Sequence, residues 1–114
     1  RDILVYGDFF FTDAVRYEPA AAAQYLSDPA VAGLLSGLRT RVAASAAFGV
    51  SDVEAVIRSY AAERGIPARE IVHPTRVALT GKTAGPGLFE LMALLGSDRV
   101  VRRLDAAVAF LTKR

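Results

Sequence analysis

The sequence contains no cysteine and a single histidine, His73. Without cysteine the chain can form neither a disulfide framework nor a thiolate metal site, and it has no thiol nucleophile. His73 cannot build a histidine metal cluster by itself, and no serine stands near it in the sequence to suggest a catalytic triad. We therefore expect no catalytic residue, no metal site and no cofactor in this chain.

Long apolar runs are also missing. No uninterrupted apolar stretch reaches about 18 residues, which a membrane-spanning helix needs. The chain does not open with the basic, apolar and small-residue segments of a signal peptide, so no membrane partner is expected. These features are compatible with a cytoplasmic location. Because the chain starts at Arg1 and has no methionine before Met92, we expect it to be a piece of a longer protein.

Hydrophobic residues are abundant and make up 53% of the 114 positions. This length suits about one compact domain. Much of the hydrophobic fraction is alanine, which favours helix strongly but fills little volume. We therefore expect an all-α fold, a compact bundle of about five to six helices packed closely on small side chains.

Start and stop residues place these helices, because proline favours the first turn of a helix and glycine follows the last. A residue before proline avoids the helical conformation, so His73 is expected to be extended and to precede a short helix. The expected helices cover residues 19–26, 29–46, 51–64, a short stretch ending at 80, 86–95, and a last helix capped by Ser97. Residues 3–17 are expected to form an irregular or partly extended arm.

One internal boundary is expected at residues 48–50. There an alanine-rich helix gives way to Ser51 and Glu54, which have the spacing of a capping box at the start of the next helix. The boundary divides the chain into residues 1–48 and 49–114.

Positive charge is concentrated after this boundary. The net charge is only +2, but residues 49–114 hold ten basic groups against seven acids. Arg99, Arg102 and Arg103 are expected to share the solvent-side arc of the last helix, where they could contact phosphates of a polyanion. A solvated helix face is the alternative, and Asp98 supports it with a helix-stabilising pair to Arg102.

Two short glycine motifs resemble nucleotide-binding loops but do not match them. Residues 81–83 read Gly-Lys-Thr, yet Arg76 stands where a phosphate-binding loop needs its first glycine, and a helix rather than a strand is expected before it. Residues 85–87 read Gly-Pro-Gly, but Glu90 occupies the position of the third glycine of a dinucleotide fingerprint. Neither nucleotide site is predicted.

The same segment forms a polar corner between two expected helices. A helix that begins at Pro86, with Gly85 as its cap, presents unpaired backbone amides and the positive end of its dipole, and Lys82 stands nearby. Such a surface attracts anions or polar edges, although an ordinary turn is the simpler interpretation. Arg58 and Arg76 lie on different helices, and if they converge at the corner they could stack on unpaired bases.

The second half of the chain resembles a known family. The resemblance is densest over residues 71–111 and is carried by His73, Pro74, Arg76, residues 77–90, Gly96 and residues 102–104. This segment is similar to the carboxy-terminal, anticodon-binding end of bacterial-type glutamyl-tRNA synthetases, which are class I enzymes. The resemblance implies an all-helical anticodon-binding body, with residues 1–48 ending a first subdomain that is truncated at its start and residues 49–114 forming a second, terminal one.

In that family the body follows a catalytic domain that uses ATP and Mg to join glutamate to tRNA. The His-Ile-Gly-His-like and Lys-Met-Ser-Lys-Ser-like signatures of that domain are absent here, so this chain is not expected to aminoacylate. The resemblance implies as partners the anticodon loop of glutamate tRNA and the parent catalytic domain in cis. It leaves open whether the parent also charges glutamine tRNA. We expect a monomer.

Site residues follow from the same resemblance. Arg76 matches the family arginine ahead of the Leu-Thr-Gly turn, and Pro86 and Leu88 match the turn that meets the second and third anticodon bases. Arg58 matches a further base-contacting arginine. Gly85 departs from the threonine or serine often found before that proline, which removes a hydroxyl and leaves backbone donors. The residue that reads the first base would fall at or before the first position of this chain.

Candidate contacts to the RNA backbone are Lys82, Arg99, Arg102 and Arg103. An alternative of another class remains, a non-catalytic helical protein-interaction or structural module with no RNA role. Clustering of Arg58, Arg76 and the start of the helix at Pro86 on one face would favour RNA, and their dispersal would favour the structural module.

Overall fold

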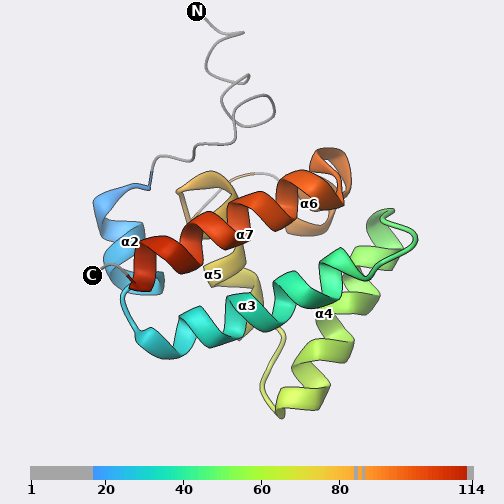
Figure 1. The fold of residues 1–114 in the computed structure, drawn as a ribbon, viewed down its shortest axis with the longest axis horizontal. Coiled ribbons are helices and arrows are strands. Elements are labelled where there is room, and N and C mark those ends of the chain that lie inside the picture. Colours follow the sequence, from blue (N-terminus) through green and yellow to red (C-terminus); the bar gives the residue numbers. More distant parts are fainter. Residues whose placement is uncertain (1–16, 84, 86, 113–114) are drawn as a thin grey trace, which may run out of the picture.

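The computed structural model describes residues 17–83, 85 and 87–112. These residues form six α-helices and no strand (Figure 1): α2 (Pro19–Tyr25), α3 (Pro29–Ala43), α4 (Val50–Arg64), α5 (Arg69–Thr80), α6 (Leu88–Leu95) and α7 (Ser97–Thr112). The expected all-α bundle of five to six helices is confirmed. The arm expected at residues 3–17 lies outside the described residues apart from Tyr17.

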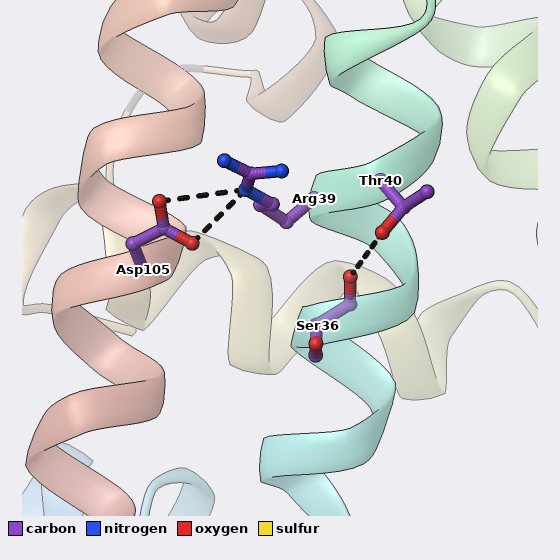
Figure 2. Close-up of polar contacts among 4 residues, drawn as sticks. All are labelled: Ser36, Arg39, Thr40 and Asp105. Atoms are coloured by element: carbon purple, nitrogen blue, oxygen red, sulfur yellow. Dashed lines mark hydrogen bonds and ion pairs between the residues drawn. The ribbon is translucent and has the colours of Figure 1, made fainter.

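Helices α3 and α7 form the centre of the fold. They lie side by side and run in opposite directions, with α2 at one end of the pair, α4 and α6 at the other, and α5 crossing behind (Figure 1). Figure 2 shows an ion pair across the seam, in which Arg39 Nε lies 3.1 Å from an Asp105 oxygen. Both side chains are exposed, at 41% and 55%, so this pair contributes at most about 1 kcal/mol and apolar burial dominates.

The apolar core joins the two halves of the chain. Leu35 and Leu38 of α3 and Val100 and Leu104 of α7 are fully buried and belong to one cluster. The boundary expected at residues 48–50 falls between α3 and α4. The division into two subdomains stays a prediction, although α3 and α7 come from opposite sides of it.

Tyr60 joins α4 to α3 through a buried polar contact. Its hydroxyl donates a hydrogen bond to the main-chain oxygen of Leu34 at 2.7 Å. Its ring passes so close to Gly37 that a Cβ at that position would lie 2.9 Å from Tyr60 Cζ. Gly37 therefore lets the two helices approach each other. This close contact explains why a glycine stands inside α3, although glycine weakens a helix.

Local capping explains where α3 and α4 begin. Asp28 accepts a hydrogen bond from the Ala30 amide at 2.9 Å, which confirms the helix start expected at Pro29. The capping box expected at Ser51 is wrong by two residues. Gly49 is the cap of α4, and the Asp52 carboxylate accepts from the Gly49 amide at 2.9 Å. Asp52 competes with Glu54 for this role because aspartate reaches the cap amide equally well from the third helical position.

Helix α5 also differs from the sequence prediction. It begins at Arg69 and continues through Pro74, so His73 is helical rather than extended. Proline in a helix interior removes the amide that would bond the carbonyl four residues earlier, here that of Glu70. Pro74 is buried, whereas Glu70 is exposed, so the proline ring faces the interior of the fold. Burial of the helix overrides the local preference.

The two glycines of α3 make a matched pair for a stability test. Gly33 is exposed, and within the described residues no atom from elsewhere lies within 4 Å of a Cβ placed there. We expect Gly33→Ala to raise the free energy of unfolding by up to about 1 kcal/mol through helix propensity. Gly37→Ala should lower it by about 1–3 kcal/mol, because the added methyl overlaps Tyr60. Urea unfolding followed by circular dichroism measures both changes.

The Tyr60→Phe background tests the cause. The hydroxyl is the Tyr60 atom closest to the added methyl, so its removal should lessen the effect of Gly37→Ala by at least about 0.5 kcal/mol. Equal effects of Gly37→Ala in both backgrounds, or equal effects at Gly33 and Gly37, would contradict the close approach seen here.

Candidate nucleic-acid interface

The polar corner lies between the end of α5 at Thr80 and the start of α6 at Leu88. Gly81 is buried, whereas Lys82, Thr83, Gly85 and Gly87 are exposed. The corner is therefore anchored at its first residue and open to solvent along the described residues that follow.

The start of α6 falls later than expected. Gly87, rather than Gly85, is the cap, and Pro86 lies outside the described residues. Gly85 adopts a φ of +152°, which side-chain-bearing residues rarely take. This backbone suits glycine at position 85. Leu88 is only 4% exposed, so its side chain belongs to the core, and a base could reach this residue only through its backbone.

The Thr80 hydroxyl closes the end of α5. It lies 2.9 Å from the main-chain oxygen of Arg76 and 3.2 Å from that of Lys82, and it accepts a hydrogen bond from the Lys82 amide at 3.1 Å. Gly81 is in the left-handed conformation, with φ of +78°, and its amide bonds the Val77 carbonyl at 2.7 Å. The expected glycine stop is confirmed, and a side chain reinforces it.

Arg103 is the largest departure from the sequence prediction. It was expected on a solvent-side arc with phosphate-contacting potential, but its exposed fraction is 0%. Its guanidinium donates from Nη1 to the main-chain oxygen of Leu79 at 2.7 Å, at the end of α5. Cations are favoured at helix C-termini, where carbonyls lack intrahelical partners. The candidate contact of Arg103 with an RNA phosphate is therefore wrong.

A third contact comes from the chain segment that leads into α2. The Glu18 amide donates to the Gly81 carbonyl at 2.8 Å. Three separate parts of the chain thus bond the end of α5, namely α7 through Arg103, the α2 cap through Glu18, and α5 itself through Thr80. The sequence did not reveal the roles of Thr80 and Glu18. Glu18 bonds Gly81, which is distant in the sequence, and Thr80 acts through the hydroxyl of an ordinary residue in the last turn of α5.

The other arginines are placed as follows. Arg76 is half-buried on α5, one turn before the corner, and Arg58 lies on α4, which packs against α6. The Arg58 side chain is 63% exposed and pairs with Glu54 at 2.7 Å. Arg102 is exposed and Arg99 is half-buried on α7. Arg76 and Lys82 thus belong to one continuous segment, whereas Arg58 lies on a separate helix that packs against α6.

Glu90 places a negative charge at the start of α6. It is exposed on the first turn of α6, and its carboxylate lies against Gly87, with Cδ 3.1 Å from where a glycine Cβ would be. An acid at this place offsets the positive end of the helix dipole. The start of α6 is therefore better suited to neutral polar edges, such as those of nucleobases, than to phosphate.

Other site chemistries find little support among the residues that the structure describes. In this part of the chain no three histidine, cysteine or acidic side chains gather where they could hold a metal ion. None of the described helices has the length and apolarity to cross a membrane. Burial raises the pKa of Tyr17, whose ring packs 4.7 Å from that of Phe110.

Comparison with known proteins places this geometry in a family. A glutamate–tRNA ligase of Moorella thermoacetica is 41% identical over 103 residues, which are 90% of this chain and 21% of that protein. Glutamate–tRNA ligase 2 of Koribacter versatilis is 41% identical over 98 residues, 86% of this chain and 20% of that protein. The chain thus spans about a fifth of the length of these relatives.

A solved structure shows the same fold. The crystal structure of a glutamate tRNA ligase from Elizabethkingia meningosepticum, in complex with its amino acid, matches 96% of this chain and 22% of that one, with a TM-score of 0.85 and 24% identity. A family model described as anticodon binding domain matches residues 1–108. The chain therefore belongs to the anticodon-binding domain family.

Proposed function

We propose that this chain binds the anticodon loop of glutamate tRNA, as the anticodon-binding part of a glutamate–tRNA ligase. The observation that carries the proposal is the exposed corner after α5, which places Lys82 and Gly85 beside the helix that bears Arg76, in a chain of the anticodon-binding family. The alternative of a purely structural or protein-interaction module is not favoured by a family match that spans residues 1–108.

The chemistry of the corner suits unpaired bases. Single-stranded RNA loops are read through base edges and stacking, which need backbone groups and planar cations. The exposed corner supplies backbone groups at Gly85 and Gly87, and Arg76 and Arg58 supply guanidinium planes on two neighbouring elements. Arg58 must leave its exposed pair with Glu54, which costs little because such pairs are weak.

Phosphate contacts would come from other cations. Lys82 and Arg102 are exposed, and Arg99 is half-buried, so all three can approach an RNA backbone while Arg103 cannot. Part of the binding free energy is then electrostatic and falls as salt rises.

In the parent enzyme that we propose, catalysis would take place in another domain. This chain would hold no cofactor, and ATP and Mg would be bound by the catalytic domain in cis, where glutamate is joined to tRNA. The parent enzyme would act as a monomer in the cytoplasm, where translation takes place.

Arg76→Ala tests base reading. We expect it to reduce the preference for the glutamate tRNA anticodon stem-loop, over the same stem with a scrambled anticodon, by about 1–3 kcal/mol. The matched control is Arg69→Ala, which removes an exposed arginine from the opposite end of α5 and changes the net charge equally. Fluorescence titration with both RNAs measures the preference. If both variants lost the same amount of anticodon preference, net charge rather than Arg76 would determine that preference.

Glu90→Gln tests the charge at the start of α6. Removing this carboxylate should tighten binding of both stem-loops by about 0.3–1 kcal/mol, because the helix dipole is no longer offset, and should lower the preference for the correct anticodon. The matched control is Glu70→Gln, an exposed acid in the first turn of α5. Weaker binding after Glu90→Gln, or the same change in both variants, would contradict the role given to Glu90.

A further inference from the structure

Arg103 is buried at a cost that fold stability alone does not explain. Removing a guanidinium from water is unfavourable, and apolar residues of similar volume often serve a protein core at least as well. Arg103 is nevertheless 0% exposed and donates to the Leu79 carbonyl at 2.7 Å. What an apolar residue could not do is donate a hydrogen bond to this carbonyl in the last turn of α5.

Thr80, the residue after Leu79, connects this buried hydrogen bond to the exposed corner. Thr80 is 6% exposed, and its hydroxyl accepts from the Lys82 amide at 3.1 Å while it lies 2.9 Å from the Arg76 carbonyl. The Arg103 hydrogen bond and the Lys82–Thr80 hydrogen bond thus hold two adjacent residues at the end of α5, which the peptide bond between Leu79 and Thr80 joins. The Thr80 hydroxyl also bonds the main-chain oxygen of Arg76, the candidate base-reading residue.

We propose that Arg103 and Thr80 are positioning residues for anticodon recognition, which hold residues 80–82 in the conformation that binds RNA without touching RNA themselves. The inference rests on the proposed function and deepens it. A corner held in its binding conformation loses less conformational freedom on association, so affinity for the correct loop rises. Loss of the hydrogen bonds should therefore reduce selectivity more than it reduces stability.

The hydroxyl of Thr80 can be tested at nearly constant volume. Thr80→Val removes it, and Thr80→Ser keeps it. Thr75 supplies the matched control, because it is a fully buried threonine on the same helix whose Oγ1 has no hydrogen-bond partner within the described residues. The three variants and the unmodified 114-residue chain are titrated with the correct and scrambled anticodon stem-loops.

Thr80→Val should lower the ratio of the two affinities by about threefold to tenfold, the worth of one hydrogen bond. Thr80→Ser and Thr75→Val should leave the ratio within about twofold of the unmodified chain. Hydrogen exchange supplies a readout that a general loss of stability would not reproduce. The Lys82 amide should exchange faster in Thr80→Val and not in Thr75→Val, with core amides unchanged in both.

Arg103→Lys provides a second test. Lysine keeps the charge but lacks the planar, forked donor of arginine, so the variant should retain helical circular dichroism and lose selectivity. Arg69→Lys, a change of the same kind at an exposed arginine at the start of α5, should leave selectivity unchanged.

The outcomes separate this inference from the proposed function. If the unmodified chain binds both stem-loops equally, the proposed function fails and the inference falls with it. If the unmodified chain discriminates, but Thr80→Val and Arg103→Lys discriminate equally well, the anticodon-binding function stands and the positioning role is overturned. A loss of selectivity that Thr80→Ser does not rescue would likewise overturn the role of the hydroxyl.

Discussion

The hydrogen bond from the Arg103 guanidinium to the Leu79 carbonyl links the core of this protein to its exposed corner. It is buried, it joins α7 to the end of α5, and it places a positive charge where the α5 dipole is negative. A buried charge persists only where partners compensate its lost hydration. The end of α5 and the position of α7 therefore depend on each other, and the residues after Thr80 start from a defined place.

The α3–α7 pair makes this link possible. α7 lies along α3 with Leu104 in the shared core, so the side chain of Arg103 is carried inward toward α5 rather than outward. In the middle of α3, Gly37 lets Tyr60 approach, and the Tyr60 hydrogen bond joins α4 to the same scaffold. α4 in turn packs on α6, so both sides of the corner rest on one apolar core.

The electrostatics of the corner are less positive than the local charge count suggests. Glu90 lies against the first residues of α6 and offsets its dipole, and Arg58 is paired with Glu54. In the interface we propose, shape and hydrogen bonding would serve the bases, and exposed cations such as Lys82 and Arg102 would meet the RNA backbone. This division of labour agrees with a domain that must distinguish one anticodon from others, since phosphate contacts are common to all tRNAs.

The sequence by itself determined the helical class, the start of α3 at Pro29 and the glycine stops after α4 and α5, because these signals act within a few residues of the chain. Even local signals failed where two residues competed, as Asp52 did with Glu54. Only the tertiary structure decided that α5 runs through Pro74, since burial of that helix outweighs a missing amide. It also decided the fate of Arg103, which the helical period alone placed beside Arg102 in solvent. The carbonyl that draws Arg103 inward belongs to a residue 24 positions away, and no pattern within α7 reports its presence.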